Sequence, residues 1–115
     1  MSTLHQQQII RGMRRALVVA GIPLTWEGPA GVVDFIAIKN PIEPAADGVD
    51  RNTGNNAPCT LDTLVEDYFP GAVMPTQDDS LKGDDGLYYR IARREWVPGQ
   101  AVVQFHCPNV VTLPV

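Results

Sequence analysis

The apolar positions at the start of the chain recur at steps of three and four, the spacing that gathers side chains on one face of an α-helix. Thr3 and Gln6 fit a capping box at the start of this helix. Gly21 is expected to stop it in the left-handed conformation, and Pro23 prevents it from resuming. We therefore expect a helix over residues 3–20, with an apolar face formed by Ile9, Ile10, Met13, Leu17 and Ala20.

Beyond Gly21 the pattern changes to the period of two that is typical of β-strands. Residues 22–27 predict a first short strand, and residues 32–39 give the clearest strand of the N-terminal half. Its alternating positions predict one face formed by Val33, Phe35, Ala37 and Lys39. The opposite face is then formed by Val32, Asp34, Ile36 and Ile38. Because both faces are partly apolar, the strand suits a barrel, or a sheet that is partly covered on its second side.

The stretch from Gly86 to Cys107 predicts a β-hairpin, because aromatic and β-branched residues flank a Pro-Gly turn. One arm covers residues 87–95 and the other covers residues 101–107. Residues 59–67 fit either a strand or a helix, and we interpret them as a strand. Residues 78–86 read as a turn-rich lead into the hairpin, and residues 110–115 as a last edge strand.

These elements predict a single domain over residues 1–115 that is mainly β. We expect a small β-barrel or sandwich of about five to seven strands, packed by the one N-terminal helix. Within it, the register of the strands places Phe35, Ile91, Val103 and Phe105 in the core.

Composition narrows the classes of function. The chain has 115 residues, a net charge of -4 and a pI near 4.9, whereas a general nucleic-acid binder is normally basic. Its two cysteines, Cys59 and Cys107, form neither a zinc pattern nor a dense disulfide framework. We expect two reduced thiols in a cytosolic protein. We also expect no secretory signal and no membrane span, because the apolar runs are short.

Residues 41–58 form a long polar loop, rich in proline, glycine, asparagine and aspartate. A loop of this composition cannot pack firmly on its own domain, so we expect it to be mobile and to act as an assembly contact. The alternation of a calcium-binding loop is absent, which argues against a metal site. Its candidate contact residues are Asp47, Asp50, Arg51 and Asn52.

Two groups of arginines are candidate contact residues, and each group can also be explained as a solvent-exposed face that contacts no partner. On the helix, Arg11, Arg14 and Arg15 form either a solvated face or a surface that meets an acidic partner. In the hairpin, Arg90 and Arg94 are expected on one strand face and Arg93 on the other. These arginines either pair with carboxylates of a neighbouring subunit at an exposed rim or line a channel that touches nucleic-acid phosphates. Alternatively, they lie on a solvated sheet face and discourage its edge from pairing with another strand.

The sequence contains histidine, cysteine and acidic residues, but not in the arrangements that catalysis requires. His106 precedes Cys107, but adjacent strand residues point to opposite faces and cannot form a thiol–imidazole pair. The acidic residues of the 78–86 stretch are sufficiently explained as turn formers. We therefore expect no enzymatic activity, no catalytic residue, no metal and no cofactor.

Several segments, taken in order, resemble the head-tail joining proteins of tailed bacteriophages, also called connectors, stoppers or tail attachment proteins. These segments are the helix ending in AGIPLTWEGPAG, the strand VVDFIAIKNP, the long polar loop, and Gly83-Asp84 followed by YYRI and a closing strand. The resemblance implies a small β-barrel with an N-terminal helical segment and long loops. It also implies a structural protein with no active site.

In that family the protein forms a ring between the portal or adaptor complex and the tail, and viral DNA passes through without sequence-specific binding. The resemblance therefore implies a homo-oligomeric ring on assembly and a monomer when free. It places the protein in the virion neck, and in the cytoplasm of the bacterial host before assembly. Two alternatives stay open: a small cytosolic β-barrel that recognises a protein or peptide, and an enzyme of a type the sequence does not reveal.

Overall fold

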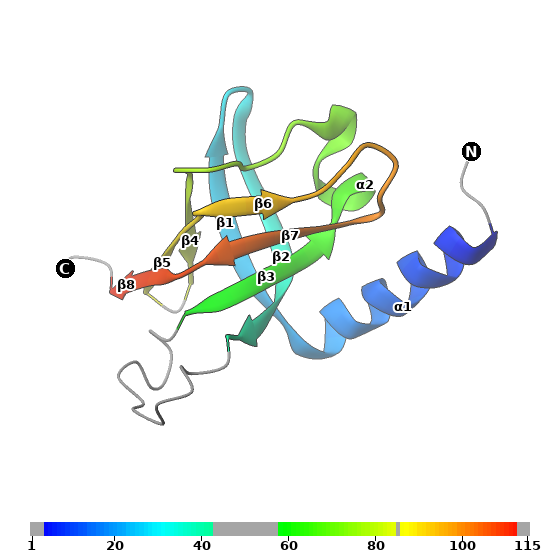
Figure 1. The fold of residues 1–115 in the computed structure, drawn as a ribbon, viewed down its shortest axis with the longest axis horizontal. Coiled ribbons are helices and arrows are strands. Elements are labelled where there is room, and N and C mark those ends of the chain that lie inside the picture. Colours follow the sequence, from blue (N-terminus) through cyan, green and yellow to red (C-terminus); the bar gives the residue numbers. More distant parts are fainter. Residues whose placement is uncertain (1–3, 43–57, 85, 113–115) are drawn as a thin grey trace.

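The computed structural model describes residues 4–42, 58–84 and 86–112. Within them, a helix, α1 (Leu4–Ala20), precedes a sheet of antiparallel strands (Figure 1), which confirms the mainly β fold. A short helix α2 (Val65–Tyr68) and a 3-10 turn η2 (Pro70–Ala72) follow the third strand. The strands are β1 (Gly21–Gly28), β2 (Gly31–Pro41), β3 (Cys59–Leu64), β4 (Ser80–Gly83), β5 (Leu87–Arg90), β6 (Arg93–Glu95), β7 (Val102–Cys107) and β8 (Asn109–Thr112).

The sheet curls back on itself through one bent hairpin. Its strand order is β6-β7-β3-β2-β1-β4-β5-β8, so β5 and β6 lie near opposite ends although they are consecutive in the chain. Arg90 pairs with Asn109 between β5 and β8, and Arg93 pairs with His106 between β6 and β7. Both pairs fit one and the same antiparallel register. The segment with β5 and β6 therefore pairs with the segment with β7 and β8 on both sides of a bend, and the sheet becomes barrel-like.

The prediction of one unbroken strand over residues 87–95 is wrong. The strand ends at Arg90 and resumes at Arg93. At the bend, the amide of Ile91 donates to the carbonyl of Asp79 at 2.9 Å, and that of Ala92 donates to the carbonyl of His106 at 2.8 Å. These bonds satisfy the backbone where the ladder is interrupted. The bend allows one strand to pair at both ends of the curled sheet.

Three other boundaries differ from the sequence-based expectation. Residues 59–64 are a strand as expected, but residues 65–68 form α2. The stretch expected to be only turns contains β4, whose alternate residues Leu81 and Gly83 are buried. The polar loop expected over residues 41–58 starts later than predicted, because Pro41 still belongs to β2 and pairs with Cys59. The remainder of that loop, residues 43–57, lies outside the described residues.

The core lies inside the curled sheet. Phe35, Ile91, Val103 and Phe105 are each exposed by 2% or less, which confirms the predicted core. The aromatic centre of this core is Phe69, which follows α2: its ring centroid lies 5.1 Å from that of Phe35 and 6.4 Å from that of Phe105. Both pairs have the edge-to-face geometry that aromatic rings prefer.

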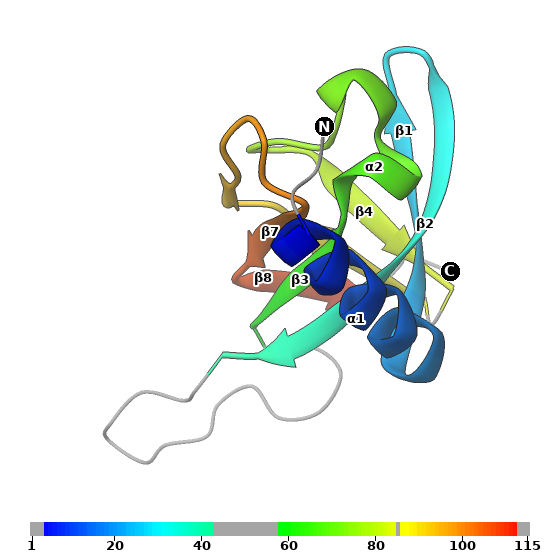
Figure 2. The same cartoon turned by 90° about the vertical axis from the view of Figure 1, so that its right-hand side faces the viewer.

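Helix α1 covers the outer face of β2 and β3 (Figure 2). Ile10 and Leu17 are buried in a second apolar cluster together with Leu64 of β3. The predicted apolar face is therefore correct in its centre and wrong at its edges. Ile9 is 42% exposed and Ala20 is also exposed. The outward residues of β2 supply the remainder of the contact, since Ile36 and Ile38 pack against this cluster.

Gly21 ends the helix for a different reason from the one expected. It is the first residue of β1 and is not among the residues with positive φ. A Cβ atom built on Gly21 would overlap the side chain of Ile36 and the carbonyl oxygen of Leu17. Glycine at this position therefore lets the chain leave α1 and enter the sheet without a steric collision.

Candidate interaction surfaces

The outward side of α1 carries exposed apolar residues. Leu4 is 73% exposed, Val18 is 84% exposed and Val19 is 81% exposed. Leu4, Arg11 and Val18 are seven residues apart, and a spacing of seven brings side chains back to nearly the same angle around a helix. Arg15 lies one turn after Arg11. We define the α1 outer face as Leu4, Arg11, Arg15, Val18 and Val19.

The three helix arginines have different environments. Arg14 binds Asp67 with two hydrogen bonds, from Nε to Oδ2 at 2.9 Å and from Nη2 to Oδ1 at 2.7 Å. It also reaches Glu66 Oε1 at 3.3 Å. The hydrogen bonds from Arg14 lower the pKa of Asp67. Arg14 thus joins α1 to α2, and we interpret it as a residue that stabilises the fold and not as a contact for a partner.

Arg11 and Arg15 are exposed, and neither has a hydrogen bond or ion pair within the described residues. They face away from the barrel between the exposed apolar residues of α1. Of the three helix arginines, these two remain available to a partner.

The three hairpin arginines do not share the faces expected from an unbroken strand. Arg94 donates to the carbonyl of Pro75 at 3.2 Å and so holds the segment after η2. Arg93 lies 2.9 Å from Glu95, and Arg90 lies 3.6 Å from Asp78. The bend at Ile91 separates Arg90 from the other two. The structure therefore does not gather the three arginines into one patch.

The candidate contact residues of the polar loop, Asp47, Asp50, Arg51 and Asn52, lie outside the described residues.

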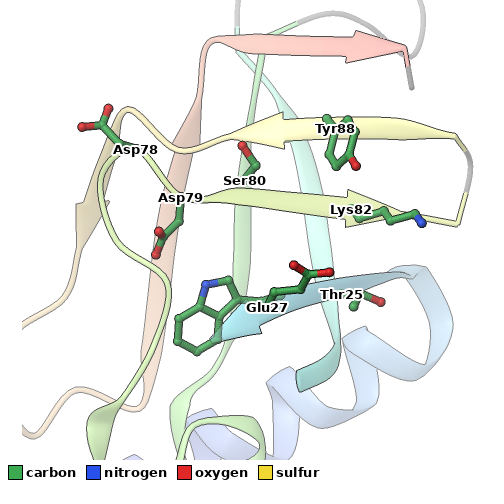
Figure 3. A pocket seen from close by; sticks show the side chains of 8 residues that line it. Thr25, Glu27, Asp78, Asp79, Ser80, Lys82 and Tyr88 are labelled. Carbon is green, nitrogen blue, oxygen red and sulfur yellow. The ribbon is translucent and has the colours of Figure 1, made fainter. Parts of the chain in front are cut away.

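A surface pocket opens on the outer side of β1, β4 and β5 (Figure 3). Its volume is about 290 Å³. Cross-strand pairing explains its composition, because Thr25 lies opposite Lys82, and Lys82 lies opposite Tyr88. The lining residues are Thr25, Trp26, Glu27, Asp78, Asp79, Ser80, Lys82 and Tyr88.

The carboxylates of this pocket are not equivalent. Asp79 Oδ2 accepts from the amide of Thr76 at 3.0 Å and stabilises a turn, which confirms the turn interpretation for this residue. Asp78 is paired with Arg90 and has a positive φ of 73°. Glu27 is exposed and has no hydrogen bond or ion pair within the described residues. Glu27 is consequently the carboxylate most available to a cation from outside.

A second polar group lies on the outer side of β3, β6 and β7, and sequence reasoning missed it. Asp62 accepts from Gln104 at 3.0 Å and from Asn40 at 3.2 Å. Burial raises the pKa of Asp62. His106 lies 3.4 Å from Glu95. The period-two alternation of polar residues in β3 and β7 is the signal that could have revealed this group. Its members bind mainly one another, which favours a role in holding the strands together.

Buried polar groups gather at one end of the barrel interior. Cys59 and Cys107 pair directly across β3 and β7, and both are buried free thiols, as expected. Burial raises the pKa of Cys59 to about 11 and that of Cys107 to about 12. Lys39 donates to the hydroxyl of Tyr89 at 3.2 Å. Thiols with such raised pKa values are poor nucleophiles at neutral pH.

His106 and Cys107 occupy opposite sides of β7. The histidine is half-buried on the outer side, and the thiol is buried inside. The geometry agrees with the expectation that these neighbours do not form a catalytic pair. Within residues 4–42, 58–84 and 86–112, no three His, Cys, Asp or Glu side chains are arranged to hold a metal ion. Nor does any helix in these ranges have the length and apolar character to cross a membrane.

A scan against protein-family models gives no match to this chain, and a search of curated protein sequences gives none either.

Proposed function

We propose that the chain is a structural protein of the neck of a tailed bacteriophage, where copies of it form a ring that joins the DNA-filled head to the tail. The observation that carries this proposal is the α1 outer face. It combines apolar side chains that are 73 to 84% exposed with two arginines that have no partner within the described residues. Apolar groups that exposed, set beside arginine, are typical of a surface that contacts another protein.

The helix presents this face rigidly. Ile10 and Leu17 bury its inner side. Arg14 binds Asp67, and the side-chain amide of Gln6 donates to the carbonyl of Gly99 at 3.2 Å. These contacts fix the middle and the start of α1 to the barrel. A preordered surface loses less entropy on association than a flexible one, so it suits an assembly that must form in a defined geometry.

Charge is also consistent with a neck protein. The chain has a net charge of -4, so phosphates of passing DNA are repelled on average. Tight contacts between the protein and DNA phosphates would slow the exit of DNA. Each contact releases counterions from the DNA, and breaking the contact requires counterions to bind the DNA again. A ring of copies with a net negative charge would surround DNA without holding it. The resemblance of the chain's segments to head-tail joining proteins supports the same role.

A mass measurement tests this proposal. The purified chain is mixed with portal or portal–adaptor complexes of the phage that encodes it, and the mass of the product is determined. We expect several copies to bind each complex. Val18→Asp should abolish this binding while leaving the fold intact, because Val18 is 84% exposed.

The matched control is Val73→Asp, since Val73 is 50% exposed but follows η2 and does not belong to the α1 outer face. This variant should bind as the parent does. Absence of binding by the parent chain, with complexes that are competent for tail attachment, would overturn the proposed function.

A further inference from the structure

Positive charge is concentrated on α1. The helix contains three arginines and neither aspartate nor glutamate. Because the whole chain has a net charge of -4, the remainder of the sequence has a net charge of -7. Arg14 is already bound to Asp67 and Glu66, so the charge that faces outward on α1 comes from Arg11 and Arg15. The net charge of α1 thus has the opposite sign to that of the remaining sequence.

The complementary surface is the outer side of β1, β4 and β5, next to the pocket of Figure 3. Glu27 and Asp79 contribute two negative charges, exposed Lys82 contributes one positive charge, and Asp78 is paired with Arg90, so the side chains that line the pocket leave this surface net negative. Exposed valines flank the pocket on both sides. Val32 lies opposite Glu27 in the β1–β2 ladder, and Val111 lies opposite Tyr88 in the β5–β8 ladder. We define the β1–β4 face as Glu27, Val32, Asp79, Tyr88 and Val111.

We propose that the α1 outer face of one copy docks on the β1–β4 face of the next copy. Arg11 and Arg15 lie against Glu27 and Asp79, and the exposed valines of the two faces pack beside these charges. This inference rests on the proposed function, since it names the contact between neighbouring copies in the ring.

The placement of the two faces on the barrel allows such a contact to repeat. Helix α1 packs on β2 and β3, so it leaves the outer side of β4 and β5 uncovered (Figures 1 and 2). Two different surfaces that recognise each other make a head-to-tail contact, which closes into a ring when the rotation between copies allows it. A contact between identical surfaces would instead stop at a dimer.

The protein already contains one example of the recognition that we propose. Arg14 of α1 binds the adjacent carboxylates Glu66 and Asp67 of α2. Glu27 and Asp79 likewise line one pocket, whereas Asp78 is already paired with Arg90. Arginine recognises carboxylates through its planar fork of donors, and this preference applies within a chain and between copies.

Sedimentation equilibrium of the full chain, measured up to millimolar concentration, tests this contact. We expect weak self-association that becomes weaker at high salt, because exposed charge pairs are screened. Arg11→Glu combined with Arg15→Glu should weaken association at least about tenfold, and Glu27→Lys should do the same. Joining all three changes in one chain should restore most of the association, because the charges are again complementary.

Two control variants show whether position matters as well as net charge. Asp84→Lys changes the charge as Glu27→Lys does, but Asp84 does not line the pocket. Arg93→Glu changes the charge on β6, a strand that contributes no residue to either face. Both should associate within about twofold of the parent, as expected for changes outside a contact.

A parent chain that stays monomeric throughout this concentration range would overturn the proposed contact. So would a Glu27→Lys variant that associates as the parent does. If the monomeric chain nevertheless binds portal complexes, the α1 outer face meets a portal protein instead of a second copy, and the proposed function stands without this contact.

Discussion

The guanidinium group of Arg14 holds both carboxylate oxygens of Asp67, at 2.9 Å for Nε to Oδ2 and 2.7 Å for Nη2 to Oδ1. The two residues are 53 positions apart in the sequence. This contact joins the middle of α1 to α2, and α2 leads directly to the core residue Phe69. This ion pair therefore adds to the apolar packing of Ile10 and Leu17 in fixing the orientation of the α1 outer face relative to the barrel core.

Arg14→Ala should lower the melting temperature slightly, by an amount that depends on pH. Arg14 holds the pKa of Asp67 below its ordinary value of 3.8, so the pair stabilises the fold above that pH and loses its effect as pH falls through the folded pKa. Thermal melts of parent and variant should differ at pH 7 and converge in strong acid. A difference that stays constant down to the lowest pH would show that Arg14 acts through packing and not through charge.

Two glycine substitutions should have opposite effects. A Cβ atom on Gly12 meets nothing within 4 Å, so Gly12→Ala should stabilise α1 by about 1 kcal/mol through helix propensity. A Cβ atom on Gly21 would overlap Ile36 and the backbone of Leu17, so Gly21→Ala should destabilise the protein. Denaturant unfolding measures both changes. If Gly21→Ala stabilises the protein as Gly12→Ala does, the close approach of β1 to the end of α1 is incorrect.

Phe105→Ala should cost roughly 3–5 kcal/mol, the usual range for removing a large core aromatic residue. The side chain is fully buried and makes edge contacts with Phe35 and Phe69. Such a loss threatens the stability of a small domain. Val111→Ala is the control on β8, because Val111 is 54% exposed and its truncation should have little effect. Equal melting temperatures for Phe105→Ala and the parent would place Phe105 outside the core.

Cys59 and Cys107 should resist thiol reagents in the native protein and react fully after denaturation. Burial raises their pKa values from 9.0 to about 11 and about 12. The sign of this shift means that their contribution to stability is intact below pH 9 and is lost as pH rises through the folded pKa values. A count of two reactive thiols after denaturation, without prior reduction, is the expected result. Finding none would reveal a disulfide.

Local periodicity was sufficient to predict much of this fold. It located the body of α1, strands β1 and β2, and the burial of Phe35 and Phe105, because each depends on alternation within a few residues. Free thiols were also predictable, since two widely spaced cysteines form no framework.

Features created by distant pairing were not predictable. Strand β4 has only Leu81 and Gly83 as buried positions among turn-forming residues, and its partners are β1 and β5. The bend at Ile91 serves the closure of the sheet and has no local glycine or proline to mark it. For the same reason, sequence alone placed Arg90 and Arg94 on one face and did not connect Arg14 with Asp67.

The most direct measurement of the central proposal is electron microscopy of particles made when the coding region of this chain is deleted from its phage. The proposal predicts DNA-filled heads and separate, complete tails, and normal particles when the parent chain is supplied from a plasmid. A plasmid carrying Val18→Asp should fail to restore them, whereas Val73→Asp should succeed. Infectious tailed particles assembled in the absence of the chain would contradict the account.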